Sequence, residues 1–162
     1  MESKKFFEHF KELNYRIYIS LIVIAIFFTT SYINYTSIYE VLISPLISAG
    51  YSTTDLVAFT IYEGFQVKIL NTFFVSLTLA IPLVIFILGY FFKPALDSTS
   101  HITFLTYLII FITLFYLGIF SAYKTIPIGI NFLLEFNESE FILRSQNYFQ
   151  LISRISILFG LS

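Results

Sequence analysis

Residues 69–96 read ILNTFFVSLTLAIPLVIFILGYFFKPAL, and this stretch decides the fold. It contains no charged residue for 24 positions, from Ile69 through Phe92. A helix of that length is about 36 Å long, enough to cross the hydrocarbon core of a bilayer with some tilt. Pro82 lies near its middle; a mid-helix proline is costly in water, but within a membrane neighbouring helices can satisfy the carbonyl that it frees. The stretch therefore predicts a transmembrane helix kinked at Pro82.

The composition of the whole chain also indicates a membrane protein. Of the 162 residues, 57% are hydrophobic and only 12% are charged, whereas a soluble domain carries about a quarter charged residues. A net charge of −1 argues against a nucleic-acid partner, which requires clustered Lys and Arg. The absence of cysteine excludes disulfides, thiolate zinc sites and thiol nucleophiles. The abundance of Phe, Tyr, Ile, Asn and Lys is typical of an AT-rich genome, which suggests an organellar or endosymbiont gene.

The remaining segments are assigned from charge-free runs and from helical periodicity. Before the first run, Phe6, Phe10, Leu13 and Ile17 recur at helical spacing, which predicts an amphipathic helix in the headgroup layer. The last run is about 24 Å long as a helix, short of a full crossing, so we expect either a fragment or a helix that ends within the membrane. The expected single membrane domain contains, in chain order, an interfacial helix (1–16), span 1 (17–39), an outer loop (40–68), span 2 (69–92), an inner hairpin (93–101), span 3 (102–123), an outer segment (124–146) and an incomplete span 4 (147–162).

Charge on the two sides of span 1 predicts the orientation of the chain. The segment before it contains Lys4, Lys5, Lys11 and Arg16, whereas the loop after it has no Lys or Arg until Lys68. Short loops rich in Lys and Arg stay on the cytoplasmic side. We therefore expect the N-terminus inside and residues 40–68 outside.

Small residues and prolines mark expected structural positions. Pro45 lies in the turn-rich outer loop, and Pro127 lies in the outer segment. Gly118 and Ala122 are four apart in span 3, a small-xxx-small pair that permits close contact between helices.

No enzyme motif is present in the sequence: it has no phosphate-binding loop, no H-E-x-x-H and no G-x-S-x-G. His9 and Glu12 have the spacing of two metal ligands on one helix face, but a polar pair on an interfacial helix explains them better. His101 is best explained as a loop or interface residue. We expect no cofactor and no metal.

Several charged residues are expected to lie near the membrane surface or within it. Glu12 is expected to be a solvated carboxylate that pairs locally with Lys11 or Arg16. Glu63 and Lys68 flank the outer start of span 2, where we expect them to cap the helix or to snorkel. Arg154 falls within an apolar run, so it either faces protein or water or snorkels near the end of a short helix.

Six pieces of the chain, in order from Phe6 onward, resemble the TatC family, the multispanning subunit of the twin-arginine protein translocase. No single piece is decisive, but their order and spacing are specific. They are FFEHFKELNYR (6–16), ISPL (43–46), FTIYEGFQVKI (59–69), AIPLVIFILGYFFKPAL (80–96), GIFSAYKTIPIGINFLL (118–134) and NYFQLISRISILFGLS (147–162).

The resemblance implies a fold and a function. TatC proteins fold as six transmembrane helices around a concave face, of which this chain would form the first four. They bind the paired arginines of a signal peptide on the cytoplasmic side, and they assemble with single-span subunits of the TatA and TatB type to move folded proteins across the membrane. The resemblance thus implies an all-α polytopic protein that catalyses no covalent step and works in an oligomeric complex.

The resemblance also implies a site. Glu12 is the carboxylate expected to contact an arginine of the signal peptide, and Phe91 and Pro94 are expected to shape the hairpin side of the site. The family has a second carboxylate in the inner hairpin, where this chain has Ser100; Asp97, three residues earlier, is the candidate to replace it.

Two other classes of function are alternatives to a role in protein transport. Ser100 and the short length favour a structural subunit of an organellar inner-membrane complex related to TatC. An enzyme or proton channel ranks third, because no predicted span contains a carboxylate. The expected location is the mitochondrial inner membrane, with a bacterial cytoplasmic or plastid membrane as the alternatives.

Overall fold

The computed structural model describes residues 2–92, 101–135 and 143–162 of the chain. Most of the predicted inner hairpin, including Pro94 and Asp97, lies outside these ranges. Five helices account for most of the described residues, and two short strands pair in parallel. The elements are α1 (Glu2–Ile33), α2 (Tyr35–Ser48), the 3₁₀ turn η1 (Thr53–Asp55), β1 (Leu56–Val57), α3 (Glu63–Phe92), α4 (His101–Glu135), β2 (Leu143–Arg144) and α5 (Ser145–Leu161).

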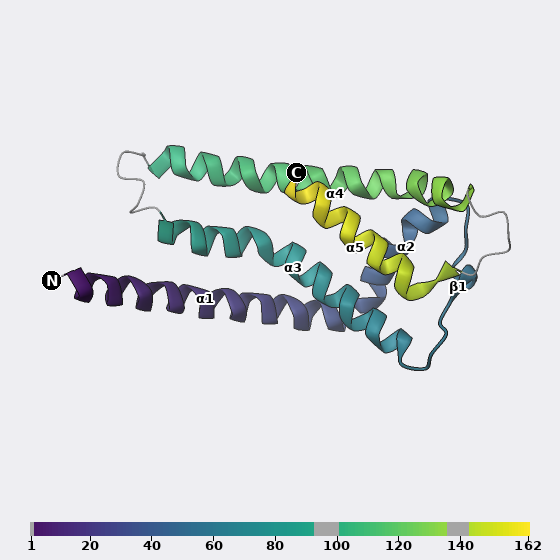
Figure 1. Cartoon of the computed structure of the whole chain (residues 1–162), viewed down its shortest axis with the longest axis horizontal. Helices are drawn as coiled ribbons and strands as arrows, with labels where there is room; N and C mark the ends of the chain where they lie inside the picture. The colour runs from purple at the N-terminus through teal and green to yellow at the C-terminus, as the bar shows by residue number, and fades with distance from the viewer. Residues whose placement is uncertain (1, 93–100, 136–142) are drawn as a thin grey trace.

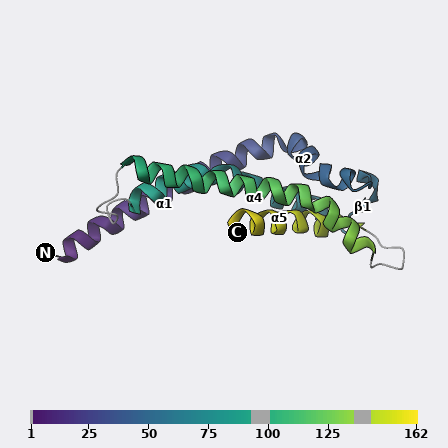
Figure 2. The ribbon, with the colours of Figure 1, turned by 90° about the horizontal axis from the view of Figure 1, so that it is seen from above.

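Three long helices, α1, α3 and α4, lie side by side and alternate in direction (Figure 1). Helix α2 lies at the end of the molecule opposite the N-terminus, and α5 runs back from that end to about the middle of α4. Seen from above, the helices form a thin, bent layer (Figure 2). Among the described residues, three stretches are long and apolar enough to cross a membrane: His9–Ile33, Glu63–Phe91 and His101–Leu133. The prediction of an all-α, multi-pass membrane protein is confirmed.

Some helix ends differ from the predicted segment boundaries. They do so where one helix gives way to the next and the residues on both sides are apolar. Span 1 was expected to continue to Tyr39, but α1 ends at Ile33, and α2 begins after Asn34. Asn34 separates the two helices with a non-helical backbone conformation (φ −94°, ψ 26°), and its side-chain amide donates a hydrogen bond to the carbonyl of Thr30 at 2.8 Å. The predicted outer loop therefore contains most of a helix, and α4 continues through Pro127 to Glu135. The predicted boundaries rest on charge-free runs, and such a run does not reveal a turn between two apolar helices.

The buried core gathers where α2 meets the first turns of α3 and α5 and the last turns of α4. Leu46 and Ile126 are almost completely buried there. Away from this cluster, the long helices expose large apolar side chains, as expected for surfaces that face lipid. The cluster consists of Leu42, Ile43, Leu46, Val67, Ile126, Ile130, Tyr148, Phe149 and Ile152.

Pro82 interrupts the hydrogen bonding of α3, and a side chain of α4 compensates. Proline has no N–H, so the carbonyl four residues earlier, that of Thr78, loses its helical donor. The hydroxyl of Tyr116 donates a hydrogen bond to this carbonyl at 3.0 Å. The contact ties α4 to α3 at the point where the proline weakens α3.

Pro45 has the same effect on α2, and a second tyrosine of α4 supplies the donor. The freed carbonyl is that of Val41, and the hydroxyl of Tyr123 donates a hydrogen bond to it while also contacting the hydroxyl of Ser44. Tyr116 and Tyr123 are seven residues apart, so they lie on the same face of α4. One face of α4 therefore compensates the prolines of two different helices.

Tyr148 of α5 inserts its hydroxyl into the next turn of α2. It donates a hydrogen bond to the carbonyl of Leu42 at 2.9 Å and accepts one from the N–H of Leu46 at 3.2 Å. These two backbone groups are normally partners of each other in an α-helix. The buried tyrosine thus ties α5 to α2 through the backbone rather than through side chains.

Helices α4 and α5 meet at a backbone contact made possible by two glycines. A Cβ atom added to Gly118 would lie 2.1 Å from the carbonyl oxygen of Phe159 and 2.9 Å from the Cα of Gly160. Real side-chain carbons do not approach a backbone oxygen this closely, so only glycine fits at position 118. One turn later, Ala122 is fully buried.

We expect Gly118→Ala to lower the melting temperature of the protein in detergent, because the added methyl group forces α4 and α5 apart. Overpacking of this kind costs about 1–3 kcal/mol. The matched control is Gly129→Ala in the same helix, where an added Cβ meets nothing within 4 Å. Alanine is a better helix former than glycine, so the control should be unchanged or slightly stabilised. Equal melting temperatures for the two variants would contradict the close contact.

We expect Tyr116→Phe to destabilise the protein by about 1–3 kcal/mol, because it leaves the Thr78 carbonyl without a donor in lipid. In a Pro82→Ala background, the new backbone N–H at position 82 should pair with that carbonyl, so the same Tyr116→Phe change should cost less. Thermal unfolding of the four proteins of this double-mutant cycle measures the coupling. Tyr107→Phe, at a tyrosine of α4 with 65% exposure, is the control. An equal loss in both backgrounds would contradict the proline compensation.

Candidate functional site

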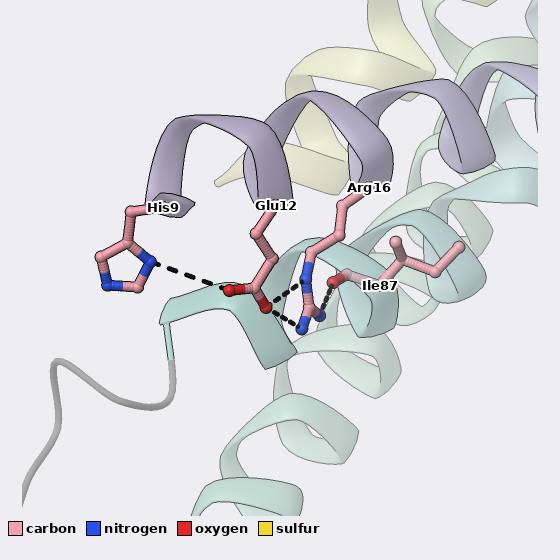
Figure 3. Close-up of polar contacts among 4 residues, drawn as sticks. All are labelled: His9, Glu12, Arg16 and Ile87. Atoms are coloured by element: carbon pink, nitrogen blue, oxygen red, sulfur yellow. Dashed lines mark hydrogen bonds and ion pairs between the residues drawn. The ribbon is translucent and has the colours of Figure 1, made fainter. Parts of the chain in front are cut away.

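Glu12 and Arg16 form an ion pair on α1 near the N-terminal end of the molecule. Four residues separate them, so both side chains lie on one face of the helix. The Nη2 atom of Arg16 lies 2.6 Å from Oε1 of Glu12, and its Nε atom lies 3.2 Å from the same oxygen (Figure 3). Of the two local partners expected for Glu12, the structure pairs it with Arg16. Such a pair contributes about 0–1 kcal/mol when exposed, so its geometry matters more than its stabilising effect.

Arg16 also links α1 to α3. Its Nη1 atom donates a hydrogen bond to the carbonyl of Ile87 at 2.9 Å (Figure 3). The Arg16 side chain is 22% exposed, whereas that of Glu12 is 43% exposed. Arg16 is therefore held between the helices, and Glu12 extends from it toward the surface.

His9 lies on the other side of Glu12 and contacts Phe91. Its Nδ1 atom is 3.8 Å from Oε2 of Glu12, which is beyond hydrogen-bond distance (Figure 3). The His9 ring meets the Phe91 ring edge-on with centroids 5.5 Å apart. The structure thus brings Phe91, a residue expected at the site, to within one side chain of Glu12. The described residues contain no group of three His, Cys, Asp or Glu side chains that could hold a metal ion.

A groove between α1 and α3 opens beside the ion pair. Its volume is about 460 Å³, and its walls combine the paired charges of Glu12 and Arg16 with aromatic and aliphatic side chains. Such a groove suits a ligand that presents a basic group next to an apolar segment. The lining residues are Glu12, Tyr15, Arg16, Ile19, Phe86, Ile87 and Tyr90.

Sequence reasoning identified only part of this arrangement. The resemblance predicts Glu12 and Phe91 as site residues, but nothing in the sequence predicts the hydrogen bond from Arg16 to the Ile87 carbonyl, because a backbone acceptor has no sequence signal. Pro94 and Asp97 remain predictions, since both lie outside the described residues.

At the opposite end of the molecule, Glu63 is completely buried. Its Oε2 atom accepts a hydrogen bond from the N–H of Phe59 at 2.9 Å. Its Oε1 atom accepts hydrogen bonds from Nε of Arg144 at 3.1 Å and from the N–H of Gln146 at 3.2 Å. Instead of snorkelling toward solvent, Glu63 ties the start of α3 to the start of α5.

Lys68 lies over two aromatic rings. Its ammonium group is 4.3 Å from the ring centroid of Tyr32 and 5.3 Å from that of Tyr35. These are cation–π distances, and they join α3 to the junction of α1 and α2. The expectation that Lys68 caps the helix or snorkels did not include this contact.

Arg154 is exposed on α5, where it forms no ion pair or hydrogen bond with any described residue. Ile152, two residues earlier in the same helix, belongs instead to the buried core cluster. Arg154 and Glu12 therefore have no contact with each other in the structure.

The chain matches the family model described as "Sec-independent protein translocase protein (TatC)" over residues 8–162. It is similar to the Sec-independent protein translocase protein TatC of Magnetococcus marinus, with 28% identity over 96% of this chain and 58% of the relative. The protein of the same name from Aquifex aeolicus is 26% identical over 96% of this chain and 66% of the relative. The chain thus spans about three-fifths of the length of these relatives.

The fold is also similar to solved structures. A crystal structure of the twin arginine translocase receptor TatC, in the detergent DDM, superposes with a TM-score of 0.81 and 26% identity. The match covers 94% of this chain and 70% of that chain. A second crystal structure of the receptor gives the same TM-score with 25% identity.

Proposed function

Because the chain belongs to the TatC family, we propose that it is a membrane component of the twin-arginine protein translocase that binds the signal peptides of folded precursors. The observation that carries this proposal is the half-exposed Glu12 carboxylate at the rim of a largely apolar groove. A basic side chain of a signal peptide would pair with the carboxylate, and the adjoining apolar segment would lie along the aromatic wall. The family is one of translocase components, and the proposed role includes no covalent step.

Charge-assisted hydrogen bonding supports Glu12 as the contact for an arginine. A guanidinium donates shorter and stronger hydrogen bonds to a carboxylate than to a neutral acceptor. Pairing by Arg16 leaves one oxygen of Glu12 without a hydrogen bond among the described residues, so an incoming cation can reach it. We propose that Phe91 and Pro94 form the hairpin side of this site and that Asp97 replaces the carboxylate that the family has where this chain has Ser100.

The partners and the membrane are part of the same proposal. We propose that the chain assembles with single-span subunits of the TatA and TatB type in an oligomeric complex. Composition favours the mitochondrial inner membrane over a bacterial cytoplasmic or plastid membrane. The relatives named above are bacterial, so they support the family and not the compartment.

We expect Glu12→Ala to abolish crosslinking between the protein and a twin-arginine precursor, because it removes the acceptor for the signal's basic pair. The measurement is site-specific photocrosslinking in membranes, with membrane insertion checked by carbonate extraction. Glu40→Ala is the matched control, since Glu40 is an exposed carboxylate of α2 at the other end of the molecule. Crosslinking that persists in Glu12→Ala would remove Glu12 from the site.

We expect Lys11 and Thr54 to lie on opposite sides of the membrane, with Lys11 on the cytoplasmic or matrix side. The chain has no cysteine, so Lys11→Cys and Thr54→Cys each provide a single labelling site at an exposed position. A membrane-impermeant maleimide added from the outer side should label only the cysteine at position 54. Labelling at position 11 from that side would place Glu12 where no precursor meets it before transport.

A further inference from the structure

The ammonium group of Lys68 lies in a corner between α3 and the junction of α1 and α2, at the end of the molecule opposite the N-terminus (Figure 1). Tyr32 is the second-last residue of α1 and Tyr35 is the first residue of α2, so both rings that Lys68 contacts come from the break between these helices. Lys68 is partly buried, and no described residue forms an ion pair or a hydrogen bond with its ammonium group. The rings attract the positive charge, but they do not neutralise it.

Two hydroxyl groups beside the ammonium also have donors to spare. The hydroxyl of Tyr35 accepts a hydrogen bond from the side-chain amide of the buried Asn71 at 3.4 Å, so its own O–H remains free to donate among the described residues. Tyr32 is 39% exposed, and its hydroxyl forms no hydrogen bond with a described residue. Three N–H groups and two O–H groups on neighbouring side chains therefore suit an anion that has several oxygen atoms.

The corner lies at the level of a membrane surface. Lys68 directly precedes the charge-free run Ile69–Phe92, and Tyr32 lies near the end of the apolar stretch His9–Ile33. Tyrosine and lysine side chains at the ends of spans lie among the lipid headgroups. The oxygen-rich anion at that level is the phosphate group of a phospholipid.

An aromatic surface continues from this corner toward the middle of the membrane. Phe28 lies one turn before Tyr32 in α1, and the two rings stack with their centroids 6.4 Å apart. Phe28 is only partly buried, and Ile33 at the end of the same helix is 75% exposed. An acyl chain attached to the phosphate would lie along these side chains. A free phosphate ion would gain nothing from them, so the surroundings favour a lipid.

We propose that Lys68, Tyr32 and Tyr35 form a binding site for an anionic phospholipid. The phosphate accepts hydrogen bonds from the ammonium and from both hydroxyls, and the lipid thereby holds the break between α1 and α2 against α3. A lipid with net negative charge binds better than a zwitterionic one, because a zwitterionic headgroup carries its own cation, which competes with Lys68 for the phosphate. This inference is independent of the proposed signal-peptide site, which lies at the other end of the molecule.

The test is thermal unfolding of the purified chain in a neutral detergent, titrated with dioleoyl-phosphatidylglycerol, with dioleoyl-phosphatidylcholine or with inorganic phosphate. We expect phosphatidylglycerol to raise the melting temperature more than phosphatidylcholine does, because a ligand that binds only the folded state stabilises it. Inorganic phosphate at the same concentration should have no effect.

Lys68→Met should raise the phosphatidylglycerol concentration that gives half of the shift by at least about tenfold, since it removes the charged donor. The matched control is Lys124→Met. Lys124 is an exposed lysine of α4 whose ammonium lies 5.6 Å from the ring centroid of Phe120, and its loss should leave the response unchanged.

Two hydroxyl variants keep the test decisive even if Lys68→Met does not fold. Tyr32→Phe and Tyr35→Phe keep the rings under the ammonium but remove one donor each, so each should raise the half-effective concentration about threefold to tenfold. Equal stabilisation by the two lipids, or by inorganic phosphate and phosphatidylglycerol, would overturn the lipid site. An unchanged response in both tyrosine variants, or an equal loss in Lys68→Met and Lys124→Met, would overturn its assignment to this corner.

Discussion

A backbone carbonyl that loses its helical donor to a proline needs another donor, and two such carbonyls join the helices of this molecule. Pro82 and Pro45 free the carbonyls of Thr78 and Val41, and α4 supplies hydroxyl groups to both. Because the two tyrosines lie on one face of α4, the helix is oriented toward α2 and α3 at the same time. Each of these two prolines therefore marks a point at which α4 is joined to another helix.

This arrangement extends to the candidate site. Beyond Pro82, α3 meets α1 through the Ile87 carbonyl, which accepts a hydrogen bond from Arg16, and through the Phe91 ring, which contacts His9. Arg16 joins the two helices at that level, and Glu12 is presented beside it. The site is thus a junction of two membrane helices rather than a loop, which agrees with the need to hold a ligand at a defined height at the membrane surface.

Glu12 and Glu63, which lie at opposite ends of the molecule, show how the surroundings of a carboxylate decide whether it is structural or available for binding. Glu63 is fully buried, and its two oxygens accept three hydrogen bonds from within the protein, so no ligand reaches it from solvent. Glu12 is half-exposed, and its Oε2 atom accepts no hydrogen bond from any residue that the structure describes. Complete satisfaction makes a carboxylate structural, whereas an unused acceptor on an exposed group makes it available for binding.

The sequence by itself determined the membrane class, the apolar spans, the kinked span around Pro82 and the family, because composition, charge-free runs and ordered motifs are properties of the chain read locally. Through the resemblance it also predicted Glu12 and Phe91 as residues of the site. Only the tertiary structure decided which donors satisfy the freed carbonyls, that Gly118 meets the backbone of Phe159, that Glu63 is buried, and that Arg16 occupies one oxygen of Glu12 while bridging to Ile87. Most of these contacts join residues tens of positions apart and use backbone atoms that every residue has. No local pattern encodes such a pairing; it arises when the helices pack.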